Sequence, residues 1–237
     1  TYTTIHPASV DAIFTAAKAR GMRLYAGKTC MVRNAPEGLR DTAQSANDDS
    51  KALLAKWHGV DRLSYVITPR FSPTSTPEQL AAMGALWGEY PDCLMQTHLS
   101  EQTDEIAWVK DLFPQSRDYL DTYEAHGLLG KGGLYGHAIW LTDREKARLR
   151  EMDASLIHCP TSNTFIGSGL FDMGGLKAAG HRIGLATDGF QLLDQIVQHI
   201  RHIADDRDID LDALRDRRRI DVDVDDLALD LGKVLGV

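Results

Sequence analysis

Histidines and carboxylates follow apolar, strand-like stretches at several places in this sequence. His98 and His137 each come at the end of such a stretch, and Asp188 closes a third. Neutral imidazole is the commonest metal ligand in proteins. Two nitrogens and a carboxylate that leave a position for water form the donor set of a catalytic zinc ion. Because bound zinc lowers the pKa of its water to about 7, such a site supplies a hydroxide nucleophile at neutral pH.

Glu101 stands three residues after His98. A glutamate this close to a proposed ligand is placed to carry protons between the water and a substrate. A single histidine at a strand end is more often a hydrogen-bonded structural residue than a ligand. The metal hypothesis therefore depends on the three strand ends meeting at one edge of a sheet.

Three further histidines favour structural roles, and Cys159 is a poor candidate for a nucleophile. His58 and His126 end predicted helices, where a histidine suits the negative end of the helix dipole. His158 precedes Cys159 within a strand-like segment, which favours packing over ligation. Cys159 has no base near it in the sequence, and this disfavours a role as nucleophile.

Periodicity and capping signals predict the elements that must position these residues. The predicted strands are residues 22–31, 63–68, 93–98, 133–139, 155–159 and 182–187. The predicted helices are residues 7–19, 50–57, one starting after Thr76, one or two within 106–120 broken near Pro114, one starting after Thr142, and one ending over 176–180. Gln79 and Glu145 complete predicted capping boxes with the two threonines.

Regular alternation of strand and helix indicates parallel βαβ units, and therefore an α/β protein. The predicted strands are short and apolar, as expected where both sheet faces are covered. An open doubly wound sheet is the alternative, but the Gly-x-Gly-x-x-Gly phosphate loop does not follow the first strand. The strands end in polar residues, at the edge where a β/α barrel builds its active site.

Four motifs, in this order along the chain, resemble the amidohydrolase superfamily. They are Thr-His-Leu-Ser-Glu at 97–101, Gly-His-Ala at 136–138, Cys-Pro-Thr-Ser-Asn at 159–163 and Thr-Asp-Gly at 187–189. Residues 68–75 and 33–36 are similar to segments near the substrate in the branch that deaminates guanine. The resemblance covers about residues 3 to 189. It implies a distorted (β/α)8 barrel that holds one zinc ion per chain.

The resemblance also implies a reaction and a role for each site residue. It assigns zinc ligation to three residues, His98, His137 and Asp188. Proton transfer falls to Glu101, with Asp188 helping to orient the nucleophile, and recognition of the base falls to Arg70 and Phe71. The implied reaction is the hydrolytic deamination of guanine to xanthine and ammonia, a step of purine catabolism. The partners implied are a small purine substrate and a second copy of the chain in a homodimer.

Two departures from the family pattern shape the expected fold. The family's first barrel strand ends in a His-x-His pair of ligands, and no such pair occurs in the sequence. The six predicted strands correspond to barrel strands 3 to 8, so residues 1–190 are expected to form an incomplete (β/α)8 TIM-like barrel. Residues 191–237 contain 12 aspartates against 7 Lys and Arg and no aromatic residue. We expect this Asp-rich tail to be exposed and to take no part in catalysis.

Composition narrows the class of protein further. The net charge of −8 over 237 residues disfavours nucleic acid as a partner. No apolar run approaches the roughly 18 residues that a membrane helix needs, and no signal peptide is recognisable. Three widely spaced cysteines exclude a disulfide framework and favour the cytoplasm.

Two other interpretations stay open at the level of sequence. The same metal motifs would serve an aminohydrolase of another amino- or chloro-substituted heterocycle, since only Arg70 and Phe71 argue for guanine. The absence of His-x-His would also suit an inactive barrel fragment.

Overall fold

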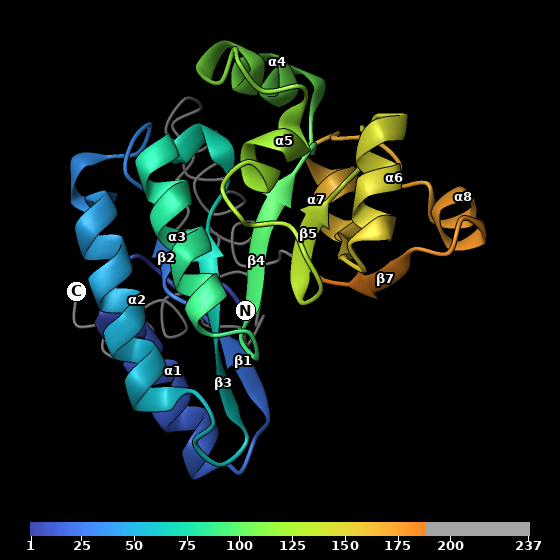
Figure 1. Ribbon diagram of the computed structural model, residues 1–237. Coiled ribbons are helices and arrows are strands. Elements are labelled where there is room, and N and C mark those ends of the chain that lie inside the picture. The colour runs from blue at the N-terminus through green and yellow to red at the C-terminus, as the bar shows by residue number, and fades with distance from the viewer. Residues whose placement is uncertain (188–237) are drawn as a thin grey trace, which may run out of the picture. The chain divides into compact units, whose positions relative to one another are not determined.

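The computed structural model describes residues 1–187, and residues 1–186 form a compact unit built on one parallel sheet (Figure 1). The sheet order is β1-β3-β4-β5-β6-β7, with β2 also paired to β3. The strands are β1 Leu24–Ala26, β2 Thr29–Cys30, β3 Leu63–Pro69, β4 Leu94–Leu99, β5 Gly133–His137, β6 Ser155–His158 and β7 Arg182–Leu185. All of these pairings are parallel. Because β1 and β7 do not pair with each other within the described residues, the barrel is incomplete, as predicted.

A helix lies in nearly every connection between strands, which confirms the predicted α/β alternation. The helices are α1 Pro7–Ala19, α2 Ala43–Trp57, α3 Pro77–Glu89, α4 Thr103–Leu112, α5 Tyr119–Glu124, α6 Asp143–Glu151, α7 Pro160–Phe165 and α8 Met173–Ala178. Two short 3-10 turns, η1 Glu37–Leu39 and η2 Ser72–Thr74, complete the unit. Among the helices of the described part of the chain, none combines the length and apolar character needed to cross a membrane.

The first predicted strand is present but interrupted. Residues 22–31 hold β1 and β2, and both pair with β3. Between them, a Cβ on Gly27 would lie 1.8 Å from the Val66 carbonyl oxygen, so only glycine fits this close approach. The Gly27 amide donates to Thr1, and its carbonyl accepts from Thr3, so residues 1–4 run extended beside the break. This edge segment was not predicted, because it is too short to show strand periodicity.

The capping residues explain which of the predicted helix starts are correct and which are wrong. The limits of α1 agree with the prediction. Helix α2 starts at Ala43 instead of residue 50, because Thr42 caps it in a reciprocal box with Ser45, a weaker signal than Glu or Gln. The box predicted at Thr76 is half wrong. The Thr76 side chain accepts from the Gln79 amide, but the Gln79 side chain is buried and does not bond the Thr76 amide.

Later in the chain, the box predicted at the start of α6 is confirmed on both sides, between Thr142 and Glu145. The predicted break near Pro114 separates α4 from α5. Helix α7 was not predicted, although Pro160 at its start is a usual first residue.

The core lies between the sheet and the helices that cover it. Phe14 of α1, Leu54 of α2 and Met83 of α3 are fully or almost fully buried in the same cluster as Tyr65 and Ile67 of β3. Each such side chain contributes about 1.5–3 kcal/mol to folding. This packing fixes the strands whose ends carry the site.

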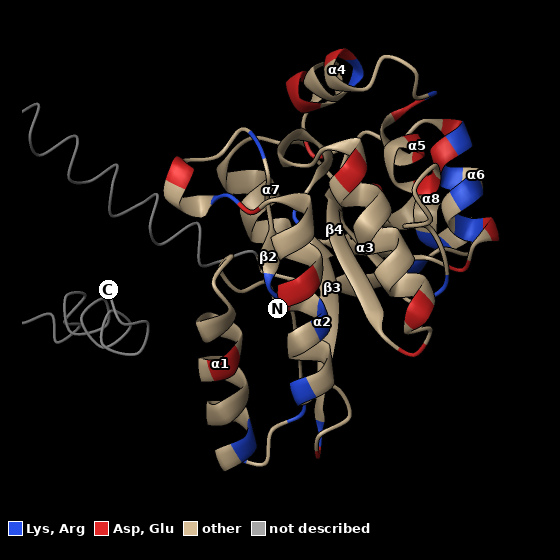
Figure 2. Cartoon of the chain, turned by 60° about the vertical axis from the view of Figure 1, so that its left-hand side comes forward, with Lys and Arg blue, Asp and Glu red and all other residues tan. Residues whose placement is uncertain are grey.

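Charged residues gather outside the core on α5 and α6 (Figure 2). Arg144 pairs with Asp118 at 2.6 Å, and Arg148 pairs with Glu124 at 2.7 Å. These pairs join α6 to both ends of α5, at its N-cap Asp118 and its last residue Glu124.

Part of the sequence-based prediction lies outside the described residues. This part comprises Asp188, the boundary at residue 190 and the Asp-rich tail, residues 191–237. They remain predictions.

Candidate active site

The sheet brings the two predicted histidine ligands together. His98 lies in β4 and His137 ends β5, and the register pairs Leu99 with His137 and His98 with Gly136. The two imidazole rings stack with centroids 5.2 Å apart and planes 22° apart. Neighbouring parallel strands thus present both rings at one edge, as the spacing predicted.

The His98 ring is held by a backbone carbonyl. Its Nδ1 lies 2.8 Å from the Arg70 carbonyl oxygen, so Nδ1–H donates and Nε2 carries the lone pair. Burial, together with the neighbouring His137, lowers the pKa of His98 to about 3. The imidazole is therefore neutral at pH 7, which is the form that binds metal.

The His137 ring is held by two side chains. Its Nδ1 lies 2.8 Å from Asn163 Oδ1 and 3.2 Å from Glu101 Oε1. The residue is buried, and its backbone is left-handed with φ 65°, followed by Ala138 with φ 48°. A non-glycine residue in this region costs about 1–3 kcal/mol, and such strain concentrates at functional sites. Two of these residues in succession, at the end of β5, match the strain that is found at functional sites.

Glu101 reaches the same place through a sharp turn after β4. Ser100 is buried and left-handed, with φ 49°. Its carbonyl oxygen accepts from the amides of Ile139 and Trp140, each at 3.1 Å. These two bonds join the turn after β4 to the segment after β5. They place Glu101 within reach of His137.

Arg70 and Phe71 follow β3 and lie beside the histidine pair. The Arg70 guanidinium carbon is 4.6 Å from the centroid of the Phe71 ring, and that ring meets His98 edge-on at 6.2 Å. Tyr2 also packs against His98, with ring centroids 4.9 Å apart. The structure therefore gathers five of the predicted site residues, namely Arg70, Phe71, His98, Glu101 and His137.

Sequence reasoning missed the side chains that orient this group. Asn163, from α7, bonds His137, and Ser168 Oγ donates to Glu101 Oε1 at 3.1 Å. Asn163 stood in a recognised motif without a role. For Ser168, the only local signal was its place between Gly167 and Gly169.

The metal hypothesis fits the imidazoles in one respect. Both His98 and His137 engage Nδ1 in hydrogen bonds to oxygen, which is how metal-ligating histidines are usually oriented for ligation through Nε2. No cluster of three or more metal-binding side chains occurs within residues 1–187. The third predicted ligand, Asp188, lies beyond that range.

Two histidines outside the group pack as expected for structural residues. His158 stacks on Phe171 with centroids 4.7 Å apart. The His126 Nδ1 lies 2.7 Å from the Thr122 carbonyl oxygen.

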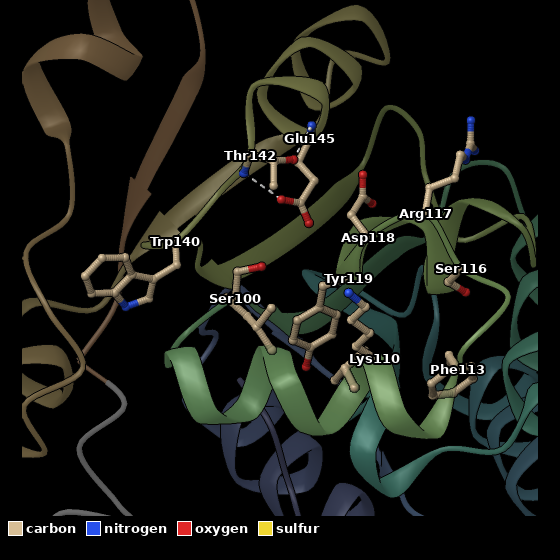
Figure 3. Close-up of a pocket in the computed structure, with 12 residues that line it drawn as sticks. Ser100, Lys110, Phe113, Ser116, Arg117, Asp118, Tyr119, Trp140, Thr142 and Glu145 are labelled. Atoms are coloured by element: carbon tan, nitrogen blue, oxygen red, sulfur yellow. Dashed lines mark hydrogen bonds between the residues drawn. The ribbon is translucent and has the colours of Figure 1, made fainter.

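A hollow between α4 and the start of α6 is separate from these residues (Figure 3). Tyr119 and Trp140 belong to its lining, and Ser100 borders it from the turn after β4. None of the predicted site residues within 1–187 lines it, so we do not place the chemistry there.

Known proteins are similar to this chain in sequence and in fold. The model of the amidohydrolase family matches residues 1–215. The guanine deaminase of Escherichia coli is 49% identical over 185 residues, which cover 78% of this chain and 42% of that protein. The solved structure of E. coli guanine deaminase superimposes with a TM-score of 0.77 at 48% identity, over 78% of this chain and 44% of that one.

A guanine deaminase of C. acetobutylicum, solved with guanine in its active site, gives a TM-score of 0.76 at 30% identity. This match covers 78% of our chain and 45% of the other. The chain thus spans less than half the length of these relatives. Family match, identity and fold agree, and the chain belongs to the amidohydrolase family.

Proposed function

We propose that this chain carries part of the active site of a zinc-dependent guanine deaminase. The observation that carries the proposal is the stacked pair His98 and His137 with Glu101 Oε1 3.2 Å from the His137 ring. The identity of 49% to E. coli guanine deaminase supports the choice of reaction. The overall change is guanine plus water to xanthine plus ammonia.

The proposed ligands are His98 and His137, each through Nε2, together with Asp188. When bound, a zinc ion lowers the pKa of a coordinated water to about 7 and so provides a nucleophile at neutral pH. Burial of His98 keeps its ring neutral and available for this purpose. We propose one zinc ion per chain.

Glu101 is the proposed proton carrier. Its carboxylate accepts a proton from the attacking water and returns it to a ring nitrogen of guanine. The C2–N bond then breaks as the remaining hydroxyl proton passes to the amino group, so that ammonia leaves and C2 becomes a carbonyl carbon of xanthine. A positioned acid or base of this kind contributes about 10²- to 10⁴-fold to the rate.

Arg70 and Phe71 are the proposed base-recognition residues. Phe71 stacks on the purine, a contact worth about 0.5–1.5 kcal/mol. The Arg70 fork donates to O6 and N7, the acceptors on one edge of guanine. Adenine carries an amino donor in place of O6, so this pair favours guanine.

The proposal includes a small purine as substrate, a role in purine catabolism, a homodimer and a cytoplasmic location. An aminohydrolase of another heterocycle is the second candidate, since only Arg70 and Phe71 separate the two. A non-catalytic barrel fragment is the third, because the sequence contains no His-x-His pair.

A substrate screen tests the proposal. The full-length enzyme, meaning the complete product of its gene, is loaded with zinc and given guanine, adenine, a pterin and a chlorotriazine. We expect xanthine and ammonia in equal amounts from guanine, and no comparable release from the others. Turnover of the triazine or the pterin without guanine would select the second candidate. Failure to retain zinc, with no turnover of any substrate, would support the third.

A further inference from the structure

We propose that Ser168, in the segment between α7 and α8, is a positioning residue that fixes the Glu101 carboxylate. This inference rests on the proposed function, because it concerns the proton carrier of that reaction. Within residues 1–187, the Ser168 hydroxyl bonds Glu101 and Gln102. Its side chain therefore acts on the reaction through Glu101.

The contacts around Ser168 form a closed ring with the proposed catalytic side chains. Ser168 Oγ donates to Glu101 Oε1 at 3.1 Å, and Glu101 Oε1 lies 3.2 Å from His137 Nδ1. His137 Nδ1 bonds Asn163 Oδ1 at 2.8 Å, and the Asn163 carbonyl accepts from the Ser168 amide at 2.9 Å. One short turn, residues 163–168, therefore holds both members of the Glu101–His137 pair.

The backbone of Ser168 is itself held in place. The Trp140 indole donates to the Ser168 carbonyl at 2.8 Å, and the residue is only 3% exposed. Gly169 follows with φ 129°, and a Cβ there would come within 3.1 Å of the Trp140 ring. Leu170, one residue further, is 85% exposed. The chain thus turns Ser168 inward two residues before the exposed Leu170.

The direction of the hydroxyl proton is also defined. Gln102 Nε2 donates to Ser168 Oγ at 3.5 Å, so the hydroxyl accepts from the amide and donates to the carboxylate. A hydroxyl that donates to a carboxylate makes a charge-assisted bond, which is stronger than a neutral one. Without this donor, the Glu101 carboxylate loses one of the contacts that orient it and samples more orientations. Misplacement of a proton carrier lowers the rate more than it weakens substrate binding.

A structural test uses the 237-residue chain itself. Crystal structures are determined for the wild type, Ser168→Ala and Ser168→Thr, and the separation of Glu101 Oε1 from His137 Nδ1 is compared. We expect this separation to exceed hydrogen-bond distance in the alanine variant and to stay near 3.2 Å in the threonine variant. Thr164→Ala is the matched control, because Thr164 Oγ1 bonds only neighbouring carbonyls in the described structure. An unchanged Glu101 in Ser168→Ala would overturn the proposal.

A kinetic test uses the zinc-loaded full-length enzyme. We expect Ser168→Ala to lower kcat for guanine about 10- to 100-fold, the size of a lost bond to a charged group, and to change KM less than about twofold. Ser168→Thr should recover most of kcat, and zinc content should not change. In a Glu101→Gln background, Ser168→Ala should cost little more, because residues that act as a unit are not additive.

The two tests separate failure of this inference from failure of the proposed function. A wild type that deaminates guanine and a Ser168→Ala variant with unchanged kcat would refute the positioning role. A rise in KM for guanine with kcat unchanged would also refute it. A wild type that leaves guanine intact would refute the proposed function, and the crystallographic comparison would then decide the role of Ser168 alone.

Discussion

Glu101 is the side chain on which the proposed chemistry depends most. It lies beside His137 and is tied to Ser168, so its carboxylate is oriented from two sides. We expect Glu101→Gln in the full-length enzyme to keep its zinc and to lose about 10²- to 10⁴-fold in turnover, the range for a positioned proton carrier. Steady-state kinetics and metal analysis on the same preparation measure both. Joint loss of zinc and activity would make Glu101 a ligand instead.

Arg70 is the residue on which the proposed choice of guanine as substrate depends. Its carbonyl oxygen holds the His98 ring, and an alanine substitution preserves that bond while removing the guanidinium. Arg70→Ala should therefore retain zinc and raise KM for guanine by about 10- to 150-fold, equivalent to about 1.5–3 kcal/mol for a bond to a charged group. Arg62→Ala, at an exposed position, is the control. Unchanged guanine kinetics would leave the enzyme class standing but remove the argument for guanine.

Site residues that are far apart in the sequence are the ones that could not be predicted to interact. His98 and His137 could be found because each stands at or next to the end of an apolar strand, and Glu101 because it follows His98 by three residues. Asn163 lies 26 residues from the histidine it orients, and Ser168 lies 67 residues from Glu101. No local pattern links such pairs, since only the folded turn 163–168 brings them to the sheet edge.

At the scale of elements, α6 depends on its cap. Thr142 and Glu145 form the reciprocal box, and Glu145 also accepts from the buried Leu120 amide of α5. We expect Thr142→Ala to lower the free energy of unfolding by about 0.5–2 kcal/mol, the usual loss of an N-cap. Thr164→Ala, on the exposed side of α7, should change it less. Denaturant titration of the two variants gives the comparison, and equal stabilities would show that the cap contributes nothing.

The elements themselves were largely predictable where their signals are strong. The six strands and α1 follow from apolar runs and from Gly and Pro punctuation. The start of α2 was missed because Ser45 takes the place of Glu or Gln in its box. The Gln79 half of the α3 box was wrong because tertiary packing buries that side chain. The first prediction failed because the box uses an unusual residue, and the second failed because a tertiary contact outweighed the local pattern.

At the scale of the whole molecule, the described residues form one part of a barrel. The sheet ends at β1 on one side and at β7 on the other within residues 1–187. The chain covers 42–44% of the length of E. coli guanine deaminase in the two comparisons. The predicted correspondence to barrel strands 3 to 8 agrees with both observations. It places His98 and His137 on neighbouring strands of the part that the chain contains.

The metal content of the full-length enzyme tests the central claim most directly. Zinc per chain is measured after dialysis for the wild type and for His98→Ala, His137→Ala and Asp188→Ala, with His126→Ala as the control because its ring bonds the Thr122 carbonyl outside the site. We predict about one zinc ion in the wild type and in the control, and a loss of more than half in each of the other three. Full zinc retention in all three ligand variants would contradict a metal centre at the ends of β4 and β5.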